Sequence, residues 1–152
     1  MTEMKKIHSR SSKDTEKVAH DFVASLEKSK DQEQATVVGL YGELGSGKTT
    51  FMKSVARAFG VEEIVTSPTF VIQKSYPLKN KRFSNLYHID AYRLTSGDDL
   101  LTLGWERVLG DPKNIIFIEW PEFISSALPA SINTVMFETI DETTRDITLN
   151  LL

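Results

Sequence analysis

A glycine-rich octapeptide constrains the fold of this chain more than any other feature of the sequence. Its residues are Gly42, Glu43, Leu44, Gly45, Ser46, Gly47, Lys48 and Thr49. The spacing of the glycines, followed by lysine and threonine, is that of a Walker A loop. Glycines are needed in such a loop because backbone amides must approach phosphates in conformations where a Cβ atom would clash. The loop therefore predicts an α/β fold in which phosphates bind at a turn between a strand and a helix.

The segments on either side of the loop have the patterns that this fold requires. Residues 35–41 are rich in β-branched side chains and predict a buried parallel strand. Residues 49–59 place Phe51, Val55 and Phe59 four apart, which predicts an amphipathic helix. Strand, loop and helix thus follow one another in the required order.

The remaining segments predict further elements of a single domain that spans residues 1–152. Helices are predicted at residues 14–28, 96–101 and 105–109, and strands at residues 70–76, 83–90, 114–118, 132–137 and 146–151. Two pairs of these strands are joined by turn-like polar segments and are expected to be antiparallel. We therefore expect a P-loop NTPase fold with a mixed, mostly parallel central sheet flanked by helices. Residues 1–10 are expected to be a flexible start or an edge of that sheet.

Composition limits the classes of partner and compartment. The 152 residues, 40% of them hydrophobic, suffice for one buried core. The formal charge of −3, from 18 basic and 21 acidic residues, gives no overall attraction to nucleic acid or to an acidic membrane. Cysteine does not occur, which excludes disulfides and thiolate metal sites. No apolar run approaches the roughly 20 residues that cross a bilayer. We expect a cytoplasmic protein with no membrane contact.

The Walker A residues have separate chemical tasks. Backbone amides of residues 45–49 and the positive end of the following helix are expected to surround the β-phosphate of a nucleotide. Lys48 would span the β- and γ-phosphates, and the Thr49 hydroxyl would coordinate Mg²⁺. The alternative is a chance match in a glycine turn, which the strand and helix context disfavours. The loop therefore predicts ATP and Mg²⁺ as ligands.

Two acidic residues end predicted strands and are candidates for the magnesium side of the site. Glu119 directly follows the apolar run 115–118, and Asp90 ends a strand in which His88 shares its face. A carboxylate at the end of a strand beside the loop can hold Mg²⁺ through a water. We assign Glu119 to Mg²⁺ and Asp90 to water orientation or a link to the metal. The alternative is that one of the two only caps a strand end.

Four further residues each have two interpretations. Thr69, in the segment Ser-Pro-Thr-Phe, could sense the γ-phosphate or belong to an ordinary turn. Arg93 could neutralise phosphoryl charge or form a surface ion pair. Trp120 could shield the nucleotide cleft or face a partner, or it could serve packing. His88 is remote in sequence from the other histidines, which favours a packed or hydrogen-bonding role over a metal ligand.

The order of the motifs resembles that of one known family. The motifs are Gly-Glu-Leu-Gly-Ser-Gly-Lys-Thr-Thr, Ser-Pro-Thr-Phe, His-Ile-Asp-Ala-Tyr-Arg and Ile-Glu-Trp-Pro-Glu. They resemble those of the TsaE or YjeE family, bacterial ATPases that serve the formation of threonylcarbamoyladenosine in tRNA. The resemblance covers nearly the whole chain. It implies a compact P-loop fold and weak ATPase activity that supports repeated transfer of threonylcarbamoyl to an adenosine beside the anticodon.

The resemblance also implies partners and site residues. The partners are the two proteins of the transfer complex, subunits of TsaB and TsaD type, with tRNA contacted only indirectly or weakly. The implied catalytic residues are Lys48, Thr69, Asp90 and Glu119, and the implied metal-binding residues are Thr49 and Glu119. The implied nucleotide-binding residues are Gly42, Glu43, Leu44, Gly45, Ser46, Gly47, Lys48, Thr49, Thr50, Arg93 and Trp120. Whether the basic hairpin at residues 74–82 contacts tRNA stays open.

Two other functions share the Walker A loop and remain alternatives. A small-metabolite kinase would use the same loop, but the chain is short for one and no segment offers an arginine-rich lid. A GTP-dependent switch protein would carry the motifs Asp-x-x-Gly and Asn-Lys-x-Asp, and neither occurs in the sequence. The sequence therefore favours ATP over GTP.

Overall fold

Strands and helices follow one another in the order that the Walker A loop requires. The computed structural model describes residues 3–30, 32–63, 65 and 72–152. The elements are β1 (Glu3–Ser9), α1 (Ser12–Glu27), β2 (Thr36–Tyr41), α2 (Lys48–Ala58), β3 (Gln73–Pro77), β4 (Asn85–Asp90), η1 (Gly97–Leu103), α3 (Trp105–Gly110), β5 (Asn114–Glu119), η2 (Pro121–Ala127), β6 (Asn133–Thr139) and β7 (Arg145–Leu151), where η marks a 3₁₀ helix. The glycine loop joins β2 to α2, as the sequence predicts.

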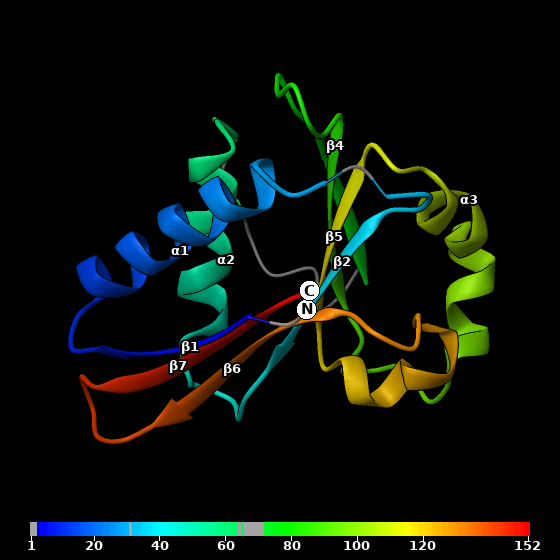
Figure 1. The fold of residues 1–152 in the computed structure, drawn as a ribbon. Helices are drawn as coiled ribbons and strands as arrows, with labels where there is room; N and C mark the ends of the chain where they lie inside the picture. Colours follow the sequence, from blue (N-terminus) through cyan, green and yellow to red (C-terminus); the bar gives the residue numbers. More distant parts are fainter. Residues whose placement is uncertain (1–2, 31, 64, 66–71) are drawn as a thin grey trace.

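The described strands form one seven-stranded sheet in the order β1-β7-β6-β2-β5-β4-β3. The central strands β6, β2, β5 and β4 run parallel to one another. The outer strands β1, β7 and β3 pair antiparallel. The sheet is therefore mixed with a parallel centre, which confirms the predicted fold class (Figure 1).

Helices cover both faces of the central sheet, and the alternation of side chains along β2 explains why. Val38 and Leu40 belong to a core cluster shared with α1 and α2. Val37 belongs to a second cluster, shared with η1, α3 and η2. Successive side chains of a strand point to opposite faces, so a continuous apolar run supplies both layers. Figure 1 shows the two helical layers on opposite sides of β2 and β5.

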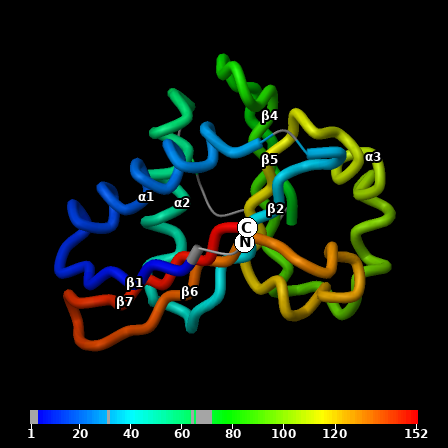
Figure 2. Tube along the Cα trace, in the orientation of Figure 1, coloured from blue at the N-terminus to red at the C-terminus, as the bar shows by residue number. Residues whose placement is uncertain are grey.

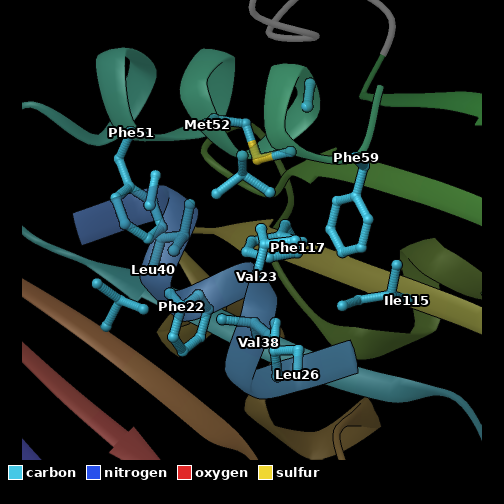
Figure 3. Close-up of a cluster of buried hydrophobic side chains, with 14 of the residues drawn as sticks. Phe22, Val23, Leu26, Val38, Leu40, Phe51, Met52, Phe59, Ile115 and Phe117 are labelled. Atoms are coloured by element: carbon cyan, nitrogen blue, oxygen red, sulfur yellow. The ribbon is translucent and has the colours of Figure 1, made fainter. Parts of the chain in front are cut away.

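Aromatic side chains hold the layer of α1 and α2 to the sheet. The ring of Phe22 on α1 lies 5.9 Å from that of Phe51 on α2 and 6.3 Å from that of Phe117 on β5. All three side chains are fully buried (Figure 3). At its start α1 is capped by Ser11, whose hydroxyl accepts a hydrogen bond from the backbone amide of Asp14. This packing fixes the position of α2, which carries Lys48 at its first turn.

Three elements add to the sequence-based expectations or differ from them. Residues Glu3–Ser9 form β1, an edge strand paired with β7, which brings the two ends of the described chain side by side (Figure 2). The helix predicted at 96–101 is the 3₁₀ helix η1, capped by Ser96. No sequence pattern predicts η2, which is irregular because Ile124 has non-helical backbone angles. In the part of the chain that the structure describes, no helix is long and apolar enough to cross a membrane.

Candidate functional site

The glycine loop turns sharply between the end of β2 and the start of α2. Gly42, Gly45 and Gly47 have φ angles of 153°, 76° and 103°, in the region that side chains rarely adopt. A Cβ atom on Gly42 would lie 2.6 Å from the hydroxyl of Ser46 and 2.9 Å from the carbonyl of Phe137. The loop can therefore follow this path only with glycine at Gly42. The same path places the first turn of α2 beside the carboxyl ends of β4 and β5.

A pocket of about 390 Å³ opens beside this loop. It lies at the carboxyl ends of the parallel strands, where open α/β sheets bind their ligands. Its lining residues are Leu44, Gly45, Gly47, Lys48, Thr49, Thr50, Asp90, Tyr92, Glu119, Trp120 and Arg145. Most of the residues that the sequence singled out therefore meet at one place.

Lys48 is the buried cation of this pocket, with only 5% of its surface exposed. Its Nζ donates a hydrogen bond of 2.5 Å to the carbonyl of Gly42 and lies 3.8 Å from the ring centroid of Trp120. Burial lowers the pKa of Lys48 below the ordinary 10.5, while the nearby charges of Glu119, Glu122 and Asp90 act in the opposite direction. The result is a desolvated ammonium group beside the glycine loop.

Asp90 and Glu119 face each other across two parallel strands. They are register partners at the ends of β4 and β5, and each is 5% exposed. Asp90 Oδ1 accepts a 3.0 Å hydrogen bond from the backbone amide of Tyr92. Glu119 Oε2 lies 2.7 Å from Nε2 of His88. The two predicted acids thus reach the same pocket from neighbouring strands, with different hydrogen-bond partners.

Trp120 forms a wall of the pocket because of an unusual backbone conformation. Its φ of 59° and ψ of 48° are left-handed, which costs a residue other than glycine about 1–2 kcal/mol. Its ring packs 5.3 Å from Tyr92 and 5.7 Å from Phe123, centroid to centroid. This turn directs the indole ring over Lys48, so Trp120 both packs and shields the buried cation. The structure thus shows the packing role of Trp120, and a role in shielding a nucleotide stays a prediction.

The donor atoms in the pocket suit a magnesium ion that shares its ligands with a phosphate. Among the described residues, no group of three or more His, Cys, Asp or Glu side chains could hold a metal by itself. Mg²⁺ typically takes one or two protein ligands and completes its shell with waters and substrate phosphates. Thr49 and Glu119 line the same pocket and supply a hydroxyl and a carboxylate. These residues fit Mg²⁺ bound together with a nucleotide.

The predicted residues differ in how they meet the pocket. Glu43 and Arg93 are exposed, and neither lines the pocket. Gly42 and Ser46 do not line it either. Gly42 still contributes, because its carbonyl accepts the hydrogen bond of Lys48. The segment with Thr69 lies outside the described residues, so its role stays a prediction.

The sequence did not point to Arg145, at the start of β7. Its Nη2 donates a 3.2 Å hydrogen bond to the carbonyl of Gly45, and its Nη1 donates a 3.0 Å bond to the carbonyl of Thr144. Arg145 and Gly45 are 100 residues apart, and only the pairing of β7 with β6 brings them together. No local pattern around Arg145 could have indicated this contact.

A second pocket adjoins the first at the start of α2. It has a volume of about 330 Å³ and shares Gly47, Thr50 and Arg145 with the first pocket. Its other lining residues are mostly hydroxyl-bearing or charged: Ser9, Arg10, Ser11, Ser12, Thr15, Glu142 and Thr143. The two pockets therefore meet at the start of α2.

Both the sequence and the fold are similar to those of one family. A family model described as threonylcarbamoyl adenosine biosynthesis protein TsaE matches residues 9–147. The chain is 38% identical over 118 residues to the tRNA threonylcarbamoyladenosine biosynthesis protein TsaE of Treponema pallidum (strain Nichols), covering 77% of this chain and 83% of the relative. It is 36% identical over 112 residues to the protein of the same name from Bacillus subtilis (strain 168), covering 74% and 67%. A crystal structure of Bacillus subtilis YdiB superposes with a TM-score of 0.76 at 27% identity, covering 99% of this chain and 86% of that one.

Proposed function

The chain belongs to the TsaE family, which acts in the threonylcarbamoyladenosine modification of tRNA, and from this premise we propose that it binds and slowly hydrolyses ATP. The observation that carries the proposal is the pocket in which the desolvated ammonium of Lys48 meets Asp90 and Glu119. A buried cation beside a helix N-terminus suits the charge of phosphates. Two carboxylates at adjacent strand ends suit the activation of water and the binding of Mg²⁺.

Each residue of the pocket has a part in the proposed reaction. Lys48 leaves the carbonyl of Gly42 and donates to the β- and γ-phosphates. Thr49 and Glu119 hold Mg²⁺, and Asp90 orients the attacking water. The metal supplies electrostatic stabilisation of the charge that develops on the transferred phosphoryl group. Trp120 excludes bulk water from the ammonium of Lys48, which strengthens its interaction with phosphate.

The second pocket is the proposed position of the nucleoside. Phosphates bound at Lys48 and Thr49 leave the sugar and base on the side of Thr50 and Gly47, which is where the second pocket begins. Ser11 and Ser12 offer hydroxyl groups there, and Arg145 lies between the two pockets. The volumes of about 390 and 330 Å³ are of the size of small-ligand sites.

The purpose of the ATP and the partners also belong to the proposal. ATP turnover by this chain supports repeated cycles of threonylcarbamoyl transfer by a complex of TsaB and TsaD type subunits in the cytoplasm. The formal charge of −3 favours a contact with those proteins over a strong direct contact with tRNA. The similarity to relatives named for threonylcarbamoyladenosine biosynthesis supports this assignment.

Titration of the purified chain with ATP and GTP tests the proposed activity. We expect ATP to bind in a Mg²⁺-supported manner and to be hydrolysed slowly, and Lys48→Ala to abolish binding. Lys53→Ala, an exposed lysine of the same helix, is the matched control and should bind normally. Tighter binding of GTP, or a stoichiometric phosphorylated nucleoside or metabolite in place of inorganic phosphate, would contradict the proposal.

A further inference from the structure

A buried hydrogen bond joins the middle of β4 to the end of β5. His88 Nε2 lies 2.7 Å from Glu119 Oε2, and the two side chains are 1% and 6% exposed. In the register of these strands, Phe117 lies opposite His88, and Glu119 lies opposite Asp90. His88 and Asp90 share one face of β4, two residues apart. The side chain of Glu119 therefore extends diagonally across the β4–β5 pair, toward the middle of β4, and contacts the imidazole of His88.

The surroundings of His88 determine which ring nitrogen carries the proton. An ionised carboxylate only accepts hydrogen bonds, so Nε2 must be the donor to Glu119. The other nitrogen, Nδ1, is buried without a hydrogen-bond partner in the described part of the chain. A proton on Nδ1 would leave a buried donor unsatisfied. The geometry thus points to an N–H on Nε2, directed at Glu119.

Lys48 is the natural competitor for the carboxylate of Glu119. Both residues line the first pocket, and opposite charges attract strongly in a desolvated site. In the structure, however, Lys48 donates to the carbonyl of Gly42, while Glu119 accepts from His88. A direct ion pair would occupy the groups that phosphate and Mg²⁺ need. His88 lies two residues before the end of β4, so its hydrogen bond holds the carboxylate of Glu119 away from the ammonium of Lys48.

We propose that His88 is a positioning residue, whose Nε2–H holds Oε2 of Glu119 and leaves Oε1 for Mg²⁺ and its waters. The described hydrogen bonds of the Glu119 side chain use Oε2 alone, which supports this division of the two oxygens. This inference rests on the proposed ATP-binding function. Loss of an outer partner that orients a metal ligand typically costs about 10- to 100-fold in metal affinity.

Manganese binding in the presence of ADP tests the inference without requiring hydrolysis. Electron paramagnetic resonance measures the dissociation constant of Mn²⁺ in the ADP complex. His88→Leu removes the donor at similar volume, and His88→Gln retains an N–H donor of similar reach. We expect Mn²⁺ to bind about 10-fold or more weakly in His88→Leu and within about threefold of the wild type in His88→Gln. His20→Leu, at an exposed histidine, is the control and should not change the affinity.

A double-mutant cycle separates positioning from a structural role. In a Glu119→Gln background, His88→Leu should have no further effect on Mn²⁺ affinity, because the carboxylate that it positions is already gone. Affinity for ADP without metal should be the same in all variants. If thermal unfolding shows that His88→Leu does not fold, His88→Asn replaces it, since its shorter amide cannot reach Glu119. The expectation for His88→Asn is the same.

The outcomes distinguish this inference from the proposed function. If Mn²⁺ binds His88→Leu as tightly as it binds the wild type, the role of His88 alone is overturned. The same holds if His88→Leu lowers Mn²⁺ affinity as much in the Glu119→Gln background as in the wild type. Failure of the wild-type chain to bind ADP at all would overturn the proposed function and this inference together.

Discussion

At the scale of single residues, burial decides what the charged groups of the pocket can do. Asp90 and Glu119 are each 5% exposed, and so is Lys48, so their charges interact in a medium less polar than water. The hydrogen bonds to Tyr92 and His88 fix the two acids separately. These hydrogen bonds restrict how the two carboxylates can move relative to each other.

The isosteric variants Asp90→Asn and Glu119→Gln test the division of labour between binding and hydrolysis. Both should bind ATP within about threefold of the wild type and lose about 100-fold or more in hydrolysis rate, the usual contribution of such groups. Nucleotide titration and a phosphate-release assay measure the two properties. Asp98→Asn, at an exposed acid of η1, should behave like the wild type. Hydrolysis at the wild-type rate in both variants would contradict the assignments.

The buried ammonium of Lys48 predicts a stability cost with a defined pH dependence. Its pKa in the folded chain is lowered, chiefly by burial, so the unfolded chain binds this proton more tightly. The charge of Lys48 therefore destabilises the fold at neutral pH, and the penalty disappears as pH rises through the lowered pKa toward 10.5. Lys48→Met should raise the free energy of unfolding at pH 7, with a gain that shrinks toward pH 10.5. Urea unfolding across this range measures the gain, and a gain that grows with pH would exclude burial as its cause.

At the scale of elements, the site depends on strands that are distant in sequence. β2 supplies the loop, β4 and β5 supply the acids, and β7 supplies Arg145, which bonds to the carbonyl of Gly45. The pairing of β6 with β7 places Arg145 beside the loop. The C-terminal hairpin therefore supports the glycine loop from the side opposite to β5.

Replacement of Arg145 tests this support. Arg145→Ala removes the hydrogen bonds to Gly45, Thr144 and Asp141. Loss of the bond to Gly45, the one that contacts the glycine loop, should weaken ATP binding by about 10-fold, which corresponds to one hydrogen bond from a charged group. Isothermal titration calorimetry measures the change. Arg57→Ala is the matched control, since Arg57 pairs with Glu16 on the helix surface at 3.7 Å. Equal ATP affinity in the wild type and Arg145→Ala would show that the loop needs no support from β7.

The elements also show what the sequence could and could not predict. The glycine loop, the parallel strands and α1 depend on local patterns, so their positions could be predicted within a few residues. β1 is mostly polar, with Lys5 next to Lys6, and has no apolar alternation that would predict a strand; it pairs with β7 about 140 residues away. The left-handed turn at Trp120 and the contact of Arg145 depend on tertiary packing. Such features leave no periodic signal in the sequence.

At the scale of the whole molecule, the candidate site residues lie together at one end of the sheet. The carboxyl ends of β2, β4 and β5 meet there, and the two helical layers cover the faces behind them (Figure 1). Tyr92, Phe123 and Leu44 are apolar residues exposed around this end, by 48%, 39% and 74%. The first pocket thus opens beside exposed apolar side chains.

We propose that ATP bound at this pocket drives repeated tRNA modification by the partner complex. The most direct measurement is the number of threonylcarbamoyladenosines formed per TsaB and TsaD type complex on excess tRNA, with this chain added as wild type or as Lys48→Ala. We expect many turnovers with the wild-type chain and ATP, and no more than about one with Lys48→Ala or without ATP. Equal multiple turnover with the wild type and Lys48→Ala would contradict it.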